Sequence, residues 1–351
     1  MSSSIKNSCV ALLLGTISLY AGCSGHADRP ADVATNNVAG PAPAGGSAES
    51  AADTREFHFT YAATINQLPA GANARVWIPL AASNSDQAVK IEQIEVPGDY
   101  QQATERKFCN RILYFEATAN GAGEIPVKIE YHVRRRALLT NNIDSLASSN
   151  SDCTPSSTFL SASAMVPVDG SIIERFFGPR AELPKGGKRA VAKSFYDRVY
   201  EHMTYDKSGA GWGRGDVKWA CESGVGNCSD FHSVFISLCR DLEIPAKFEI
   251  GFPVPADPAG GEISGYHCWA KFLDGKTWVP VDISEADKHP EQKEYLFGNL
   301  PHDRVMFSTG RDLELVPPQA TGPVNFFIYP HVEVDGKLHT EFTKNFQYSE
   351  S

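Results

Sequence analysis

Several features are missing from this 351-residue sequence, and each absence narrows the class of protein. The chain has 32 Lys and Arg against 42 Asp and Glu, a formal net charge of −10. An acidic chain is poorly suited to the phosphate backbone, so nucleic acid is excluded as a partner. After the N-terminal segment there is no run of 18 or more apolar residues, so we expect no transmembrane helix. A hydrophobic content of 42% is enough for globular cores.

The sequence also lacks the compact motifs of a metal or phosphate site. Cys221, Cys228, His232 and His267 carry ligand atoms, but their spacings fit neither Cys-x-x-Cys nor His-Glu-x-x-His. There is no concentrated acidic loop for calcium. The glycine-rich segment 209–215 is not followed by the Gly-Lys-Ser/Thr of a phosphate loop. We therefore expect no metal and no cofactor, and we interpret 209–215 as a mobile loop that faces substrate.

The N-terminus has the pattern of a processing signal. Lys6 precedes the apolar run Val10–Tyr20, and Ala21-Gly22-Cys23 follows. This resembles a bacterial lipoprotein signal (1–23), in which Cys23 becomes the lipidated first residue; a plain secretory signal is the alternative. Residues 24–54 are rich in Ala, Gly, Ser, Pro and Asn and predict a flexible linker. The sequence thus predicts an extracytoplasmic protein anchored by lipid to a bacterial membrane, at the periplasm or the cell surface, or else a secreted one.

The first part of the mature chain predicts a small β-sandwich over residues 55–138. Its strand-like runs are short, rich in β-branched or aromatic residues, and punctuated by Gly, Pro, Asn and Asp. They are Glu56–Ile65, Ala74–Pro79, Lys90–Val96, Arg111–Ala117 and Ile125–Arg134. Residues 139–351 predict a second domain with a helix at Lys188–His202. Further strands are expected at Arg311–Val316 and Asn325–Val334, with a turn at Asp335-Gly336. The fold class is therefore α+β.

A second predicted helix places a cysteine at its start. Its apolar residues recur with helical spacing, at Phe231, Val234, Phe235, Leu238, Cys239 and Leu242. Asn227 is a good N-cap, and Asp230 three residues on completes a capping-box pattern. Cys228 then occupies the first helical position, where the helix dipole and free N–H groups favour a thiolate. The helix should end before Pro245, followed by a strand over Ala246–Phe252.

A predicted hairpin brings an imidazole and a carboxylate together. Asp274-Gly275 lies between two strand-like runs, and as the loop it would place His267 opposite Asp282. A four-residue loop keeps this register and moves Pro280, which has no N–H, to a position without a ladder hydrogen bond, so we favour it. Cross-strand neighbours have Cβ atoms roughly 4.5–5.5 Å apart. The Asp282 carboxylate can then accept the imidazole N–H.

Three segments together resemble the transglutaminase-like superfamily, a branch of the papain-like cysteine enzymes. They read GNCSDFHSVFISLCRDLEIPAKFEIGF, GYHCWAKF and WVPVDISEA. The family pattern is a Cys-bearing helix ending in an R-x-x-x-I-P-A-[RK] turn, then H-x-W, then W-x-x-x-D. The resemblance covers about residues 195–350 and implies a papain-like domain, a helix packed on an antiparallel sheet. By position it places the family's catalytic triad on Cys228, His267 and Asp282.

These residue types in this order predict covalent catalysis. His267 takes the Cys228 proton, Asp282 orients the imidazole, and the thiolate attacks an amide carbonyl to give a thioester. Hydrolysis of a peptide, protein or small amide is our first expectation, and transfer to an amine is the variant. The alternative is a cell-surface binding or scaffold protein that no longer turns over.

Several other side chains are candidates near this chemistry. Trp219, Trp269 and His232 are candidates for the substrate cleft, although core packing for the tryptophans and a capping role for His232 remain open. Cys239 and Cys268 are expected to be buried thiols. Cys109 and Cys153 could pair in an oxidising compartment, which the sequence leaves undecided.

Overall fold

The computed structural model describes residues 53–140, 154–178 and 183–351. These residues all fall within one compact unit. The predicted signal with Cys23, and nearly all of the predicted linker, lie outside them. Within the described ranges no helix is long and apolar enough to cross a membrane.

The β-rich part consists of two five-stranded antiparallel sheets. The first has the order β10 (Gly261–Ile263), β16 (Phe342–Glu350), β1 (Thr54–Ile65), β6 (Ile125–Arg136), β3 (Gln87–Glu95). The second has the order β15 (Lys337–His339), β14 (His331–Val334), β2 (Asn73–Leu80), β5 (Arg111–Thr118), β4 (Tyr100–Thr104). Burial alternates along β1 and β6, as the period of two requires for strands with one covered face. The five predicted strands of this region are present, and β4 is additional.

The C-terminal strands differ from the prediction in position and in partner. Strand β16 pairs with β1 over its whole length, from Phe57 opposite Glu350 to Ile65 opposite Phe342. The sandwich is therefore not built from residues 55–138 alone, because the end of the chain returns to cover an otherwise unpaired edge of β1. Of the expected strand 325–334 only β14 forms, and 311–316 makes a single bridge at Leu313.

The helical part is built around a four-stranded antiparallel sheet. Its order is β12 (Thr277–Val281), β11 (His267–Asp274), β9 (Ala246–Pro253), β13 (Arg304–Thr309). The helices are α2 (Ser171–Phe177), α3 (Lys188–His202), α4 (Val217–Ser223), α5 (Cys228–Asp241) and α6 (Ile283–Lys288), with short 3₁₀ turns at Ser156–Leu160 and Pro290–Gln292. Two short strands, β7 (Thr204–Tyr205) and β8 (Val225–Gly226), pair in parallel. The fold is thus α+β, as predicted, with helices packed on an antiparallel sheet and a β-rich N-terminal region.

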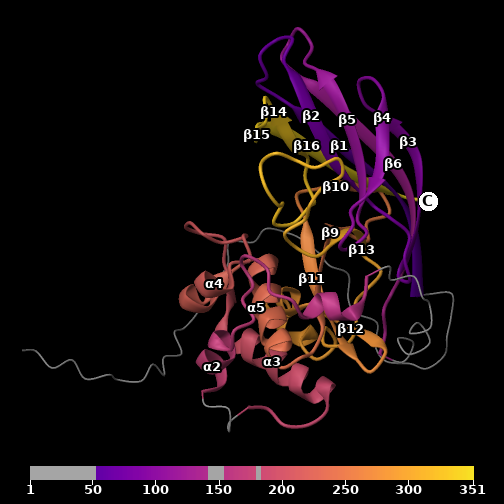
Figure 1. Ribbon diagram of the computed structural model, residues 1–351. Coiled ribbons are helices and arrows are strands. Elements are labelled where there is room, and N and C mark those ends of the chain that lie inside the picture. The colour runs from indigo at the N-terminus through magenta and orange to yellow at the C-terminus, as the bar shows by residue number, and fades with distance from the viewer. Residues whose placement is uncertain (1–52, 141–153, 179–182) are drawn as a thin grey trace, which may run out of the picture. The chain divides into compact units, whose positions relative to one another are not determined.

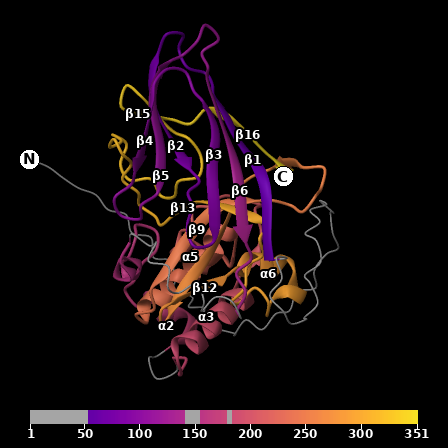
Figure 2. The same cartoon turned by 90° about the vertical axis from the view of Figure 1, so that its right-hand side faces the viewer.

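The central sheet connects the two parts. Figures 1 and 2 show the sandwich strands gathered at one end and the helices at the other, with β9 and β11 between them. On one side Phe235 of α5 packs on Phe272 of β11, with ring centroids 6.1 Å apart. Towards the end of β9, the ring centroid of Phe252 lies 5.2 Å from that of Phe59 of β1. Both faces of β9 are covered, which explains its continuous burial in place of alternation.

The β11–β12 hairpin has a different register from the predicted one. Asp274 pairs with Thr277 and Ala270 with Val281, so the loop is Gly275-Lys276. Gly275 has φ +63°, which suits the two-residue turn that places glycine first. The prediction that His267 pairs directly with Asp282 is therefore wrong. The second predicted turn, Asp335-Gly336, does form the loop of its hairpin, with positive φ at both residues.

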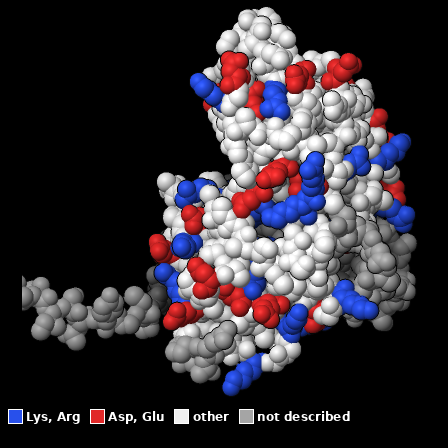
Figure 3. Space-filling view, in the orientation of Figure 1, with Lys and Arg blue, Asp and Glu red and all other residues white. Residues whose placement is uncertain are grey.

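The surface carries charges of both signs. On the face shown in Figure 3, acidic and basic side chains are interspersed over both the sandwich end and the helical end. Several form ion pairs there and elsewhere, such as Arg189 with Asp274 at 3.0 Å. Exposed pairs of this kind contribute about 0–1 kcal/mol each to stability.

Candidate active site

Cys228 is the first residue of α5, as predicted. The Asn227 side chain accepts a hydrogen bond from Ser229 N at 2.9 Å, and the Asp230 carboxylate accepts one from Asn227 N at 2.9 Å. This reciprocal capping box fixes the chain direction into the helix. The Cys228 side chain is 3% exposed. Its sulfur is thus held where the unpaired N–H groups of the first turn favour an anion.

His267 and Asp282 are in direct contact. His267 Nε2 lies 2.7 Å from Asp282 Oδ2, and both side chains are buried. Asp282 is the N-cap of α6, and its other oxygen accepts from Glu285 N at 3.2 Å. The His267 side chain also interacts with the Cys228 thiol, and this interaction contributes to the pKa shifts of both groups. The imidazole therefore interacts with both the carboxylate and the thiol.

The charges of this series reinforce one another. Burial by itself would raise the pKa of the Cys228 thiol, but hydrogen bonds from Cys268 and His267 bring it well below its usual value. Burial would likewise lower the pKa of His267, but the charge and hydrogen bond of Asp282 raise it to about 10. These shifts favour a thiolate beside an imidazolium, which is the reactive form of a nucleophilic cysteine.

Asp282 has a second cationic partner that the sequence did not indicate. Arg304 Nη1 donates to Asp282 Oδ2 at 2.9 Å, and the guanidinium lies 5.0 Å from the centroid of the Trp269 ring. Burial opposes ionisation of Asp282, but His267 and Arg304 hold its pKa far below the ordinary range. Arg304 is on β13, which was not predicted as a strand. An alternating apolar pattern around it, Val305 and Phe307, was the available signal.

His232 is a structural neighbour of the site. It is 0% exposed; Nδ1 lies 2.7 Å from Cys228 O, and Nε2 accepts from Ile283 N at 3.0 Å. With Nε2 an acceptor, the ring is neutral and Nδ1–H donates to the carbonyl. Burial lowers its pKa, consistent with that state. Both nitrogens are used in joining α5 to α6, which favours a structural role, and the substrate contact stays a prediction.

The two candidate tryptophans differ in accessibility. Trp269 is 0% exposed, and its Nε1 donates to Glu249 at 2.7 Å, so core packing accounts for its position and its substrate role stays a prediction. Trp219, on α4, is partly exposed. A Cβ atom on Gly211 would lie 2.7 Å from the Trp219 ring. Trp219 therefore packs against the glycine-rich loop, and its contact with substrate stays a prediction.

The glycine-rich segment 209–215 is anchored to α5. Gly213 N and Gly215 N both donate to the Asp230 carboxylate, at 2.7 and 2.9 Å. Arg311 Nη1 donates to Gly215 O at 2.8 Å. These bonds hold the segment beside the N-terminus of the Cys228 helix. The predicted mobility of segment 209–215 stays a prediction, but the segment does lie close to the site.

The remaining cysteines fall into two groups. Cys221, Cys228, Cys239 and Cys268 are buried free thiols. Burial raises the pKa of Cys239 well above its ordinary value, and burial with the Cys228 hydrogen bond does the same for Cys268. Cys109 is disulfide-bonded. Cys153, its expected partner, lies outside the described residues.

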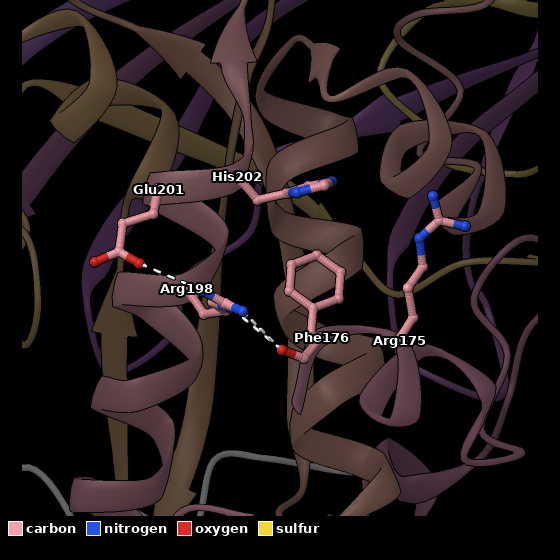
Figure 4. Close-up of a pocket in the computed structure, with 5 residues that line it drawn as sticks. All are labelled: Arg175, Phe176, Arg198, Glu201 and His202. Carbon is pink, nitrogen blue, oxygen red and sulfur yellow. Dashed lines mark hydrogen bonds and ion pairs between the residues drawn. The ribbon is translucent and has the colours of Figure 1, made fainter. Parts of the chain in front are cut away.

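A cavity lies among the helices, apart from the triad candidates. A cavity of about 240 Å³ is lined by Arg175, Phe176, Arg198, Glu201 and His202, and Figure 4 shows Arg198 directed at the Phe176 carbonyl. None of the three triad candidates lines it. Across the described ranges, no group of three or more His, Cys, Asp or Glu side chains is arranged to hold a metal ion.

Comparison with known proteins identifies the family of the site. Residues 181–283 match the model of the transglutaminase-like superfamily, and this segment contains Cys228, His267 and Asp282. Residues 181–283 of this chain are therefore similar to a transglutaminase-like domain.

Similar individual proteins carry little functional description. An uncharacterized protein of Haemophilus influenzae is 31% identical over 224 residues, which are 54% of this chain and 60% of the relative. The match thus spans less than two thirds of that protein's length. Solved structures that are similar include a candidate cysteine protease from Cytophaga hutchinsonii, at 16% identity and a TM-score of 0.49, covering 84% of this chain and 98% of that chain. Another is a TGase, at 16% identity and a TM-score of 0.29, covering 49% and 46%.

Proposed function

We propose that this protein is a cysteine-dependent acyl-transfer enzyme whose nucleophile is Cys228. The observation that supports the proposal most strongly is the contact of His267 Nε2 with Asp282 Oδ2 at 2.7 Å, together with the interaction of the same imidazole with the Cys228 thiol. The Cys228 thiol, at the capped start of α5, has a lowered pKa. This favours a catalytic role for the neighbouring His267 over a purely structural one. The similarity of residues 181–283 to the transglutaminase-like superfamily supports the same chemistry.

The reaction follows from the positions of these groups. The Cys228 thiolate attacks an amide carbonyl, and N–H groups of the first turn of α5 stabilise the oxyanion. His267 gives its Nδ1 proton to the leaving amine, leaving a thioester on Cys228. The imidazole then takes a proton from the incoming nucleophile, and collapse of the second tetrahedral intermediate restores the thiolate and the imidazolium. Asp282 holds the ring orientation and stabilises its positive charge throughout.

Hydrolysis of a peptide, protein or small amide is the preferred outcome. Water as the second nucleophile needs no dedicated binding site, whereas efficient transfer to an amine does. We further propose that the enzyme acts outside the cytoplasm, anchored through a lipid on Cys23. The support for this location is the N-terminal pattern of the sequence alone.

A second candidate is a binding or scaffold protein on the same fold. The observation that favours it is the low exposure of the site, with Cys228 at 3% and His267 at 7%. Substrate would then have to displace neighbouring side chains before reaching the sulfur.

An activity-based thiol probe distinguishes the two candidates. The enzyme should be labelled stoichiometrically at Cys228, and Cys228→Ala should abolish both labelling and turnover in a screen of peptide substrates with and without amine acceptors. Cys221→Ala is the matched control, since that thiol is also buried but has a raised pKa. Failure of the wild-type protein to label or to release any amine would support the scaffold.

A further inference from the structure

A second carboxylate lies beside the reactive nitrogen of the imidazole. Glu285 Oε1 is 3.8 Å from His267 Nδ1, on the side of the ring away from Asp282. Glu285 belongs to the first turn of α6, the same turn that Asp282 caps. Its side chain is 24% exposed, whereas that of Asp282 is 0% exposed. One helix start therefore brings a buried carboxylate to Nε2 and a partly solvated carboxylate to Nδ1.

Glu285 has a cationic partner of its own. Lys288, one turn further along α6, forms an ion pair with Glu285 Oε1 and lies over the Tyr205 ring at 4.5 Å. Lys288 also interacts electrostatically with Cys228 and Asp282. The titratable and charged groups that act on His267 or its partners come from several elements. They are Cys228 and His232 of α5, Cys268 of β11, Tyr205 of β7, Asp282, Glu285 and Lys288 of α6 with its N-cap, His289 beside Glu285, and Arg304 of β13 with its neighbour Asp303.

These groups form a set of balanced charges. Arg304 is paired with Asp282, Lys288 with Glu285, and the imidazolium with the thiolate. Removing one member of the Glu285–Lys288 pair leaves the other as an uncompensated charge next to the imidazolium and thiolate. Charges this close interact appreciably even with partial solvent screening.

We propose that Glu285 and Lys288 act as a pair of positioning residues that set the pH range over which Cys228 and His267 remain a thiolate and an imidazolium. This inference rests on the proposed function. A negative charge at position 285 makes both His267 and Cys228 harder to deprotonate, and a positive charge at position 288 makes both easier to deprotonate. The two side chains therefore shift the pKa values of His267 and Cys228 in opposite directions.

The test measures the rate of Cys228 alkylation by iodoacetamide as a function of pH. Its acidic limb reports formation of the thiolate and its alkaline limb reports loss of the imidazolium proton. Glu285→Gln leaves Lys288 uncompensated, so both limbs should move to lower pH by roughly half to one unit. Lys288→Met leaves Glu285 uncompensated, so both limbs should move to higher pH by a similar amount. The double variant should return close to the wild-type profile.

The controls separate this effect from structural damage. Glu294→Gln removes a carboxylate whose side chain is 75% exposed and which pairs with Lys193, so its profile should match wild type. Lys288→Arg retains the charge and should also match. Raising the salt concentration should shrink the shifts, because the pair is partly solvated. Thermal unfolding of every variant shows whether the fold is kept.

The outcomes distinguish this inference from the proposed function. Opposite shifts in the two single variants, with cancellation in the double variant, support the inference. Shifts of the same sign, or no shift while wild-type Cys228 reacts as a thiolate, overturn the inference and leave the proposed function standing. A wild-type Cys228 that reacts no faster than an ordinary thiol overturns both. If Lys288→Met does not fold, Lys288→Gln replaces it in the comparison with Glu285→Gln, because it also removes the charge.

Discussion

His267 Nε2 lies 2.7 Å from Asp282 Oδ2, although the two residues are not paired across the β11–β12 hairpin. The last paired residue of β12 is Val281, opposite Ala270. Asp282 follows it as the N-cap of α6. The observed register is shifted from the predicted one by two residues, which is one full period of a β-strand. Both side chains therefore still lie on the same face of the sheet. The contact depends on the turn into α6 as well as on the hairpin.

Cys228 should be the first thiol to react. Its pKa lies well below that of an ordinary thiol and the pKa of His267 is raised to about 10, so the thiolate persists at pH values where an ordinary thiol is protonated. The alkylation rate of Cys228 should therefore fall much less on acidification than that of an ordinary thiol, which loses about tenfold per unit below its pKa. Peptide mapping after brief alkylation at pH 5 measures this. Prior modification of Cys221 or Cys268 would contradict the assignment.

Asp282→Asn should damage both turnover and stability. One carboxylate oxygen accepts from His267 and Arg304, and the other accepts from Glu285 N. An amide group turned either way directs its NH₂ at a donor. We expect turnover to fall by about 10⁴-fold, as in other triads, and the free energy of unfolding to fall by about 1–3 kcal/mol. Kinetics with chemical denaturation measures both quantities, with Cys228→Ala as an inactive variant of near wild-type stability. Retention of full turnover would eliminate Asp282 from the mechanism.

Arg304→Met should lower the free energy of unfolding. It should also move the alkaline limit of the pH range of activity to higher pH. Without the guanidinium, the Asp282 charge acts on His267 alone, so the pKa of the imidazolium should rise. The free energy of unfolding should fall by about 3 kcal/mol, the lower end for a broken buried pair, since His267 remains as a partner. Arg304→Lys keeps the charge and should be intermediate. A methionine variant more stable than the lysine variant would argue against a role for this ion pair.

Two glycines of the 209–215 segment give a matched comparison. Gly215 has φ +62°, and a Cβ atom there would lie 2.5 Å from Ser233 Oγ and 2.6 Å from Arg311 Nη1. Gly209 has φ +80° with nothing within 4 Å of a Cβ atom. Gly209→Ala should cost about 1 kcal/mol, from backbone strain alone. Gly215→Ala should cost about 2–4 kcal/mol and reduce activity, because it also displaces the segment anchored at Asp230. Equal losses of unfolding free energy in the two variants would show that the anchoring contacts contribute little.

Cys23 should be acylated in the mature protein. The run that ends at Ala21-Gly22-Cys23 motivates this expectation, and more than one acyl chain on that residue would give stable membrane attachment. Detergent-phase partitioning and intact-mass measurement of the N-terminal peptide test it, with Cys23→Ser as the control. An unmodified N-terminus downstream of Cys23 would instead indicate a plain secretory signal.

The sequence by itself determined the local structures around the site. Asn227 and Asp230 define the start of α5, because their side chains cap N–H groups within three residues of their own position. The apolar stripe from Phe231 onward predicted its length, and Asp335-Gly336 predicted a hairpin loop that forms. Such features depend on neighbours in the chain, so a single sequence contains the information needed to predict them.

Only the tertiary structure decided what surrounds Asp282. The hairpin loop moved by one residue because Gly275 adopts the positive φ, a choice that local pattern left open. Arg304 reaches Asp282 from a strand 22 positions away, and β16 pairs with β1 from the opposite end of the chain. These contacts join segments that are distant in sequence, so their energies depend on how the sheets stack. Periodicity describes each segment alone and therefore could not predict them.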